Sequence, residues 1–309
     1  MWFPNQILHP IIFISIKLFH SVLASRRRRN AIVSFVENGN VVEGVQPIRN
    51  AVFTHFSNHF KKHQTFRPGV ANMNFKTLTV VEGGSLVLPF SVDEVKAAVW
   101  DCDSYKSPAP DGVNFGFIKE FWLILKEDIM RFITEFHRND KLARCINTTF
   151  ITLIPKVDSP QKLSDFRPIS LVGCLYKILA KVLANRLRLV IGKVISETQS
   201  AFVKDRQILD GVLIAIEVVD EARKMKKELL LFKVDFEKAY DSVDWTYLDE
   251  VMRKMAFPIL WRKWIKECIS TTTTSFLVNG SPTDEFHLER GLQQGDPLSP
   301  FYSFWLPRV

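Results

Sequence analysis

Residues 229–245 have the sequence LLLFKVDFEKAYDSVDW, in which an apolar run ends at a carboxylate. The first six residues are apolar except for Lys233, and the run is too short to show helical periodicity, so it predicts a short, mostly buried strand. Asp235 is the first acidic residue after it. A carboxylate at the carboxyl end of a buried strand is unfavourable unless it is solvated, paired or bound to a metal. Asp235 therefore either caps the turn after the strand or serves as a metal ligand.

The residues after this strand have a distinctive spacing. The pattern D-x-x-x-A-[aromatic]-D comprises Asp235, Ala239, Tyr240 and Asp241. It resembles the first catalytic motif of reverse transcriptases, most closely those of plant non-LTR (LINE-type) retrotransposons. The resemblance implies that Asp235 is the catalytic metal ligand and that Phe236 and Tyr240 contact the nucleotide. A flat ring beside the sugar can exclude a 2′-hydroxyl by steric contact, which gives the implied role of Tyr240 a physical basis.

The composition describes a globular, moderately basic chain. A length of 309 residues allows one large or two ordinary domains, and a hydrophobic content of 47% is sufficient for a core. The net charge of +8 and the pI near 9.3 favour an acidic partner, nucleic acid first and a membrane surface second. The four cysteines are dispersed and form no C-x-x-C pair, so neither a zinc site nor a disulfide framework is indicated.

The amino-terminal region combines an apolar run, residues 7–24, with a basic run, residues 26–29. Pro10 and Lys17 interrupt the apolar run, and the first six residues carry no basic side chain, so we expect neither a spanning helix nor a secretory signal. The location is then intracellular, nuclear or cytoplasmic, with no membrane partner. The arginines indicate a nucleic-acid or nuclear-import patch, or alternatively a solvated run. KLFHSVLASRRRRN resembles the linker between endonuclease and polymerase in plant LINE proteins, which implies an unmatched amino terminus without the endonuclease.

The next segments predict local structure without chemistry. The Asn38-Gly39 pair predicts a hairpin, and residues 45–60 predict an amphipathic helix. A Gly, Asn and Pro rich interval, residues 67–84, is the expected linker.

A capping box and a turn cluster follow the expected linker. Ser91 and Glu94 predict the start of a helix. YKSPAPDG is a turn cluster that resembles the K-S-P-G-P-D-G loop of the LINE family, with Ala109 in place of a glycine. If that position requires a positive φ, alanine costs about 1 kcal/mol or more. The alternative is that the prolines and Gly112 are only turn residues.

Residues 150–171, FITLIPKVDSPQKLSDFRPISL, predict two short strands joined by a polar turn. This hairpin projects Lys156 and Arg167, a point charge and a planar fork that together suit a triphosphate. Exposed cations more commonly serve solubility. The strings I-P-K and F-R-P-I-S resemble the fingers motif of reverse transcriptases, however, which implies that Lys156 and Arg167 hold the nucleotide phosphates.

Residues 176–194 have helical periodicity with one apolar side. A basic face comprises Lys177, Lys181 and Arg188, with Arg186 and Lys193 nearby. Such a face suits an RNA or hybrid backbone bound without sequence preference, and an ordinary solvated face is the alternative. QSAFVKDRQILDG resembles another block of the family and implies that Arg206 contacts template or nucleotide. Residues 208–227 then predict an amphipathic helix with a basic end.

The carboxyl-terminal part predicts further helices and a hairpin. Asp244 or Ser242 can cap a helix over residues 247–255, and Pro258 precedes a second helix over residues 260–270. Asn279-Gly280 predicts a hairpin between residues 275–278 and 285–288.

RGLQQGDPLSP, residues 290–300, combines a glutamine and a glycine with a proline that can start a helix. It resembles the second polymerase motif of LINE reverse transcriptases over nearly its whole length. The resemblance implies that Gln294 touches the nucleotide sugar or the template. It also implies that Gly295 lets the backbone approach a base pair closely.

Together these blocks imply an α/β (α+β) fold, a right-hand polymerase fragment with helical fingers, one β-hairpin and an incomplete palm sheet. The expected divisions are an unmatched terminus (1–16), a linker region (17–84), a fingers-like region (85–228) and a partial palm (229–309). The implied activity is RNA-directed DNA synthesis by a two-metal mechanism. The implied partners are an RNA template, a DNA primer or RNA–DNA hybrid, and a dNTP, and the implied cofactor is Mg²⁺.

The sequence contains no Asp-Asp dipeptide, whereas the family supplies its second carboxylates from an aromatic-x-Asp-Asp hairpin. We therefore expect a truncated, inactive chain that binds Mg²⁺ weakly. The alternatives are a non-catalytic protein that binds RNA and a relic of a retroelement.

Overall fold

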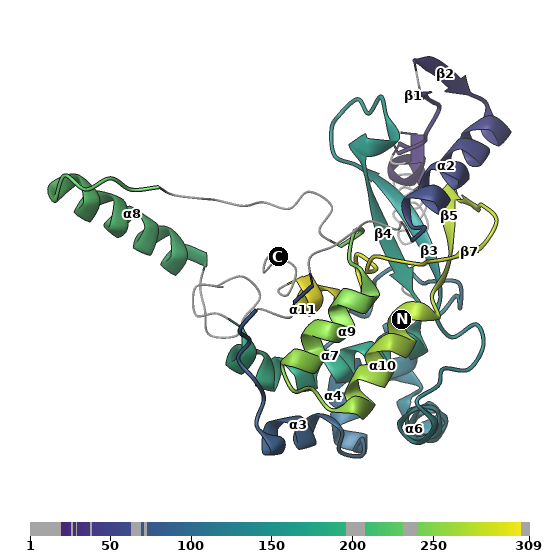
Figure 1. Cartoon of the computed structure of the whole chain (residues 1–309). Coiled ribbons are helices and arrows are strands. Elements are labelled where there is room, and N and C mark those ends of the chain that lie inside the picture. The colour runs from purple at the N-terminus through teal and green to yellow at the C-terminus, as the bar shows by residue number, and fades with distance from the viewer. Residues whose placement is uncertain are drawn as a thin grey trace, which may run out of the picture. The chain divides into compact units, whose positions relative to one another are not determined.

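The computed structural model describes residues 20–25, 27–28, 30–37, 39–62, 69–70, 73–195, 208–230 and 240–303 (Figure 1). The strands are β1 (Ser34–Glu37), β2 (Asn40–Glu43), β3 (Thr148–Pro155), β4 (Phe166–Val172), β5 (Thr273–Val278), β6 (Ser281–Pro282) and β7 (Phe286–His287). The first helices are α2 (Val45–His59), α3 (Val80–Leu86), α4 (Val92–Trp100), α5 (Phe115–Glu120), α6 (Trp122–Asn139) and the short 3-10 helix η1 (Leu163–Asp165). The later helices are α7 (Cys174–Val194), α8 (Ile208–Lys224), α9 (Trp245–Lys254), α10 (Ile259–Ser270) and α11 (Ser299–Ser303).

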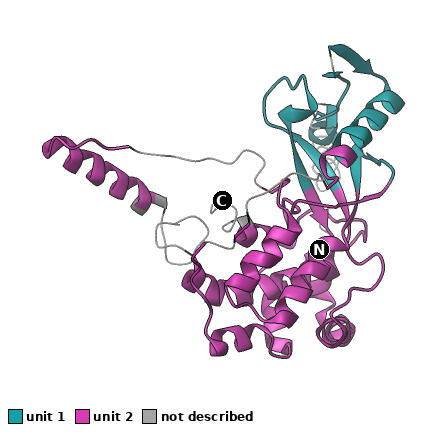
Figure 2. Ribbon diagram, viewed as in Figure 1, with its two compact units in different colours: residues 1–56, 151–169, 275–284 teal, residues 57–150, 170–274, 285–309 magenta. Residues whose placement is uncertain are grey.

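The chain forms two compact units, each discontinuous in sequence (Figure 2). Unit 1 comprises residues 1–56, 151–169 and 275–284, and unit 2 comprises residues 57–150, 170–274 and 285–309. The mixture of helices and sheet confirms the expected fold class of a polymerase-like fragment. The sequence-based divisions at residues 16, 84 and 228 stay a prediction.

The predicted hairpins are present, but the strand that follows Asn279-Gly280 is Ser281–Pro282 instead of residues 285–288, of which β7 pairs with Thr273 and Thr274. β1 and β2 are antiparallel, with Phe35 opposite Val42. β4 and β3 are neighbours in a sheet of order β4-β3-β5-β6, in which β7 also pairs with β5. The turn between β5 and β6 is Asn279-Gly280, with φ angles of 52° and 87°. These are the positive values that a two-residue hairpin turn requires.

Helix α2 also matches its prediction. Its buried residues Ile48, Val52 and Phe56 recur every fourth position and so lie on one face. The Phe56 ring stacks on Phe276 of β5 within unit 1, with ring centroids 4.2 Å apart.

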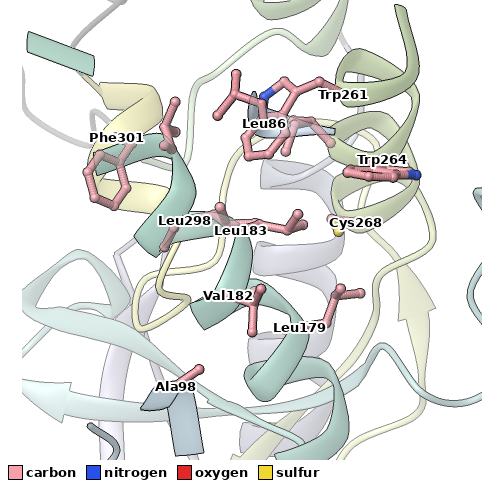
Figure 3. Packing of buried hydrophobic residues seen from close by; sticks show 14 of the residues in the cluster. Leu86, Ala98, Leu179, Val182, Leu183, Trp261, Trp264, Cys268, Leu298 and Phe301 are labelled. Carbon is pink, nitrogen blue, oxygen red and sulfur yellow. The ribbon is translucent and has the colours of Figure 1, made fainter. Parts of the chain in front are cut away.

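The core of unit 2 is built around α7. This helix is apolar on most of its circumference and is buried along most of its length, as expected for a helix surrounded by others. Leu179 and Leu183 of α7 belong to the same cluster of buried residues as Trp261 and Trp264 of α10, and Figure 3 shows part of this cluster. Leu86, Leu298 and Phe301 extend this cluster to α3 and to the carboxyl-terminal segment.

Two local predictions need correction. The expected linker comprised residues 67–84, but its last residues, from Val80 on, belong to helix α3. This helix begins at a capping box between Thr79 and Glu82. Ser91 caps α4 as predicted, accepting from Glu94 N at 3.2 Å, but the Glu94 carboxylate binds Arg186 of α7 instead of closing a box. An ion pair with a buried guanidinium outcompetes a local bond to one backbone N–H.

The condition under which Ala109 would be unfavourable, a positive φ at that position, is not met. Ala109 lies outside the residues with positive φ, whereas Gly112 has a φ of 69°. The alanine therefore causes no backbone strain, because the left-handed position of this loop is filled by glycine.

The segment that leads to Asp235 is described only in part. Leu229 and Leu230 are exposed, 44% and 90%, and lie in no strand, and residues 231–239 are outside the described residues. The preceding helix α8 is present with its basic end, Arg223 and Lys224.

The amino-terminal apolar run, residues 7–24, lies outside the described residues up to position 19. Among the helices that the structure describes, none has the length and apolar character needed to cross a membrane.

Candidate functional site

Three of the sequence blocks meet through backbone hydrogen bonds within unit 2. The first contact joins the end of β4 to the QG loop, residues 293–296, because Ser170 N donates to Gln294 O at 2.8 Å. Gly295 has a φ of 117°, and a Cβ atom there would lie 2.9 Å from Ser170 O. Only glycine combines this conformation with so close a backbone approach.

The second contact joins the segment before the QG loop to the segment after the Asp235 motif. Leu292 N donates to Tyr240 O at 2.7 Å, and Gly291 N donates to Val243 O at 2.8 Å. Gly291 has a φ of 83°, and a Cβ atom at this position would lie 2.7 Å from Asp241 O. Trp245 fixes the same segment, since its Nε1 donates to Gly291 O at 2.8 Å.

The two adjacent glutamines have different environments. Gln293 is buried, and its amide accepts from Thr149 Oγ1 at 3.1 Å and donates to Thr272 Oγ1 at 2.9 Å. The half-buried Gln294 side chain has no hydrogen bond to another described residue. Gln293 thus anchors the loop, and Gln294 is free to bind a ligand.

Asp296 holds the end of this loop, and the sequence analysis missed it. Its carboxylate accepts from Tyr176 OH of α7 at 2.7 Å and from Leu298 N at 2.7 Å. Burial raises the pKa of Asp296, although both hydrogen bonds favour the ionised form. The available signal was an acid placed three residues before the helical Ser299, a spacing typical of a helix start.

Asp111 anchors the amino terminus of α7 and was also missed. Its Oδ2 accepts from Cys174 N at 2.6 Å, so a residue of the SPAPDG turn supplies the cap that Gly173 lacks. The Cys174 thiol donates to Val113 O at 3.1 Å. Burial, followed by the negative charge of Asp111, raises the pKa of Cys174 to about 12.

The catalytic candidates around residue 235 are described only at their carboxyl end. Asp235, Phe236 and Arg206 lie outside the described residues. Tyr240 is half-buried and packs against the core of unit 2, and Asp241 lies 3.8 Å from Nε2 of His59. Within the described part of the chain, no group of three or more His, Cys, Asp or Glu side chains is arranged to hold a metal.

The two candidate phosphate ligands lie in unit 1, and both are exposed. Lys156 N donates to Asp165 O at 2.7 Å, and Lys156 Nζ donates to Ser164 O at 2.9 Å, so this side chain lies over the turn. The side chain of Arg167, on β4, has no hydrogen bond or ion pair with any residue that the structure describes. Its planar guanidinium is therefore available to an anion.

The predicted basic face of α7 has fewer free charges than the sequence indicates. Lys181 forms an ion pair with Asp101 at 2.6 Å, and its hydrogen bond lowers the pKa of that carboxyl. Lys177 lies over the Phe115 ring, 5.7 Å from its centroid. Arg188 is exposed and donates to Asn185 Oδ1 at 3.2 Å. Their role in nucleic-acid binding stays a prediction.

Comparison with known proteins shows which families this chain is similar to. Residues 154–304 match the family model described as reverse transcriptase (RNA-dependent DNA polymerase). The chain is 29% identical over 287 residues to the "Transposon TX1 uncharacterized 149 kDa protein" of Xenopus laevis, covering 92% of this chain and 22% of that protein.

Two R2 retrotransposon proteins are also similar. A Pol polyprotein of the type-1 element R2 from Popillia japonica is 28% identical over 151 residues, covering 48% of this chain and 21% of that protein. A Pol polyprotein of the type-2 element R2DM from Drosophila melanogaster is 28% identical over 194 residues, covering 63% and 18%. The chain thus spans about a fifth of the length of these relatives.

The relatives support a non-LTR retrotransposon relationship but give no support to the plant subgroup, and the expected truncation and inactivity stay predictions. The matched region contains both phosphate candidates, Asp235 and the QG loop. Residues 154–304 are thus similar to the reverse transcriptase family, and the chain as a whole is similar to proteins of non-LTR retrotransposons.

Proposed function

We propose that this chain forms the fingers and part of the palm of an RNA-directed DNA polymerase that uses an RNA template, a DNA primer and a dNTP. One observation carries the proposal. The backbone hydrogen bonds Ser170–Gln294 and Tyr240–Leu292 hold three sequence blocks together while the Gln294 side chain is left uncommitted. A structural loop would use its polar side chains internally, as Gln293 does.

In this proposal, different side chains bind the phosphates, the sugar and the base of the nucleotide. Arg167 holds the triphosphate through its planar fork and Lys156 through its compact charge. Gln294 hydrogen-bonds the sugar or the template base, and Gly295 lets the backbone approach the base pair. Phe236 and Tyr240 flank the sugar, where a ring excludes a 2′-hydroxyl.

The proposed nucleic-acid contacts are Lys177, Lys181, Arg188 and Arg206. Arg188 is the strongest of the described candidates because it is exposed and has no carboxylate partner among the described residues. Lys181 is the weakest, since an anionic strand would have to replace Asp101 as its partner.

Reverse transcriptases in general depend on a divalent metal, and we propose Asp235 as the Mg²⁺ ligand of this chain. A divalent ion at such a site supplies charge neutralisation of the phosphates. The described residues bring no cluster of ligands to that position, so no step through the metal is derived from them. Luminescence of Tb³⁺ bound to the protein tests the assignment: Asp235→Asn should lower the affinity, whereas an unchanged affinity would contradict it.

Photocrosslinking of a dNTP tests the nucleotide site. The probe is 4-thio-dTTP with a poly(rA)·oligo(dT) template–primer, in which the incoming nucleotide is templated. We expect Arg167→Ala to reduce crosslinking by about tenfold or more, because a charge-assisted fork to phosphate contributes about 1.5–3 kcal/mol. The matched control is Arg144→Ala, which removes an exposed arginine outside the family match. Equal crosslinking by the two variants would refute the proposed phosphate site.

Salt titration of hybrid binding separates synthesis from simple binding. A polymerase site requires both salt-sensitive binding of the template–primer and crosslinking that depends on the matching template base. Salt-sensitive binding with crosslinking that ignores the template would instead identify a non-catalytic RNA-binding protein.

A further inference from the structure

A pocket lies in unit 2, between helices α9 and α10. Its volume is about 440 Å³, within the range of small-ligand sites. Residues of α9 and α10 line its sides, and Lys62, Leu288 and Glu289 complete its wall. The lining residues include none of the side chains assigned above to the nucleotide or the metal.

The wall of this pocket has an apolar part with a fixed aromatic ring. Met252 and Leu288 are buried, and Ile269 is half-buried beside them. Trp245 is half-buried, and the hydrogen bond from its Nε1 to Gly291 O holds the indole in one orientation. A fixed ring in an apolar wall is a suitable surface for a planar group, because the ligand does not have to order it.

The acidic residues of the pocket are already engaged. Asp244 accepts from Thr246 N and Tyr247 N at 2.8 and 2.9 Å as the cap of α9. Asp249 accepts two hydrogen bonds from Arg262, at 2.8 and 2.6 Å. Glu289 accepts from Lys62 N at 2.9 Å.

Two cations of the pocket remain without such partners. The ammonium groups of Lys62 and Lys266 have no ion pair or hydrogen bond with another described residue. Arg262 and Lys266 are four residues apart on α10, so they lie on the same face of the helix. The chemical complement of this pocket is therefore a ligand with a planar, largely apolar part and a negative charge.

We propose that this pocket binds one unpaired nucleotide of a nucleic-acid strand, with its base against Trp245 and Met252 and its phosphate between Lys62 and Lys266. The inference rests on the proposed function, which supplies a nucleic-acid strand as the ligand. Base stacking on an aromatic side chain is tolerant of sequence, and lysines bind the strand through its phosphates. An unpaired segment of the template fits this chemistry better than a duplex, whose bases are stacked on one another.

Binding of a labelled single strand to matched lysine variants tests the proposal. The probe is fluorescein-labelled U12 RNA, followed by anisotropy at several salt concentrations. Lys266→Ala should weaken binding on the order of fivefold and lower the salt slope by about 0.7, the value for one lost phosphate contact on a single strand. Lys263→Ala is the control, because it lies on the same helix but pairs with Asp140 at 3.0 Å and does not line the pocket. The affinities of the two variants for a blunt RNA–DNA hybrid should differ much less than their affinities for U12.

Crosslinking locates the base and identifies the source of the nucleotide. U12 RNA with one 4-thiouridine should label a peptide that contains residues 245–252, and Lys266→Ala should reduce this label. Equal U12 affinity of Lys266→Ala and Lys263→Ala would overturn the proposal. Displacement of U12 by UMP at equal concentration would also overturn it, because the site would then belong to a free nucleotide.

The outcome for this pocket is separable from that of the nucleotide site. If template-dependent dNTP crosslinking depends on Arg167 but Lys266→Ala leaves the affinity for U12 unchanged, only the proposed role of the pocket is refuted. Absence of binding to both U12 and the hybrid refutes the pocket and the proposed function together.

Discussion

Replacement of Arg186 by alanine should destabilise the protein far more than the same change at Arg188, two residues further along α7. Arg186 is 7% exposed, and its guanidinium donates two hydrogen bonds to the Glu94 carboxylate, at 2.6 and 2.7 Å. It also donates to the carbonyl oxygens of Leu86, Leu88 and Pro89, at distances of 3.0, 2.6 and 3.1 Å. The guanidinium carbon lies 4.2 Å from the centroid of the Phe90 ring.

The magnitude follows from what remains after the side chain is removed. Arg186→Ala leaves a carboxylate that is 25% exposed and three carbonyl groups without their donor. Removal of one partner from a buried ion pair costs about 3–5 kcal/mol. For a unit of this size, 1 kcal/mol corresponds to about 2–4 °C in Tm, so the expected decrease is about 6–20 °C.

Thermal unfolding followed by circular dichroism measures this difference, with Arg188→Ala as the control. Arg188 is exposed and binds only Asn185, so its removal should change Tm by no more than about 2 °C. Arg186→Lys should be intermediate, because an ammonium keeps the charge but loses the fork that reaches both Glu94 and the carbonyl groups.

The two arginines should respond in the opposite order in nucleic-acid binding. Arg188→Ala should lower the salt slope for the hybrid by about 0.9, whereas folded Arg186→Lys should leave it unchanged. A decrease in Tm below about 3 °C for Arg186→Ala, or a slope that changes with Arg186 and not with Arg188, would refute the assignment of a structural role to Arg186.

Three further predictions concern the loops that hold the site. Asp296→Asn should remove a pH dependence of stability. The raised pKa of Asp296 stabilises the folded state of the original protein below pH 3.8, and this contribution is lost as the pH rises through the folded pKa. In urea unfolding, the free energy of unfolding of the variant should therefore increase relative to that of the original protein as the pH rises. Gly291→Ala should cost more than about 2 kcal/mol because of the contact with Asp241 O at 2.7 Å, whereas Gly84→Ala, with open space in a helix, should stabilise by about 0.5–1 kcal/mol in the same assay. Asp111→Ala should cost about 1 kcal/mol by removing the cap of α7, and an Asp111→Asn variant that is equally unstable would contradict that cause.

Local sequence patterns predicted the elements of this chain well where the determining contacts are local. The hairpin at Asn279-Gly280 depends on two residues that adopt positive φ, and α9 depends on Asp244 as its cap. The choice between Asp244 and Ser242 as the cap was left open, and the structure selects Asp244. A Thr79–Glu82 capping box was equally local but lay within a segment taken as a linker because of its Gly, Asn and Pro content.

The candidate site residues were recognisable in the sequence as blocks, but their arrangement in space was not. The strings FRPIS, AYDSVDW and QQGDP carry the family resemblance, and the family match confirms it. Their assembly through Ser170, Gln294 and Tyr240 depends on pairing between segments more than 50 residues apart. Local sequence patterns carry no information about such long-range pairing. The sequence therefore could not distinguish Gln293, whose side chain is buried and hydrogen-bonded, from Gln294, whose side chain is available to a ligand.

The same limit explains the charges of α7. The sequence by itself determined that residues 176–194 form a helix with an apolar side and several cations, since spacing fixes which side chains share a face. Only the tertiary structure decided that Arg186 is buried against Glu94, that Lys181 is paired with Asp101, and that Arg188 is exposed. The physical reason is that the state of a charge depends on its solvation and its nearest opposite charge. Here the partners come from α4 and the residue that follows it, 92 residues before Arg186 and 80 residues before Lys181.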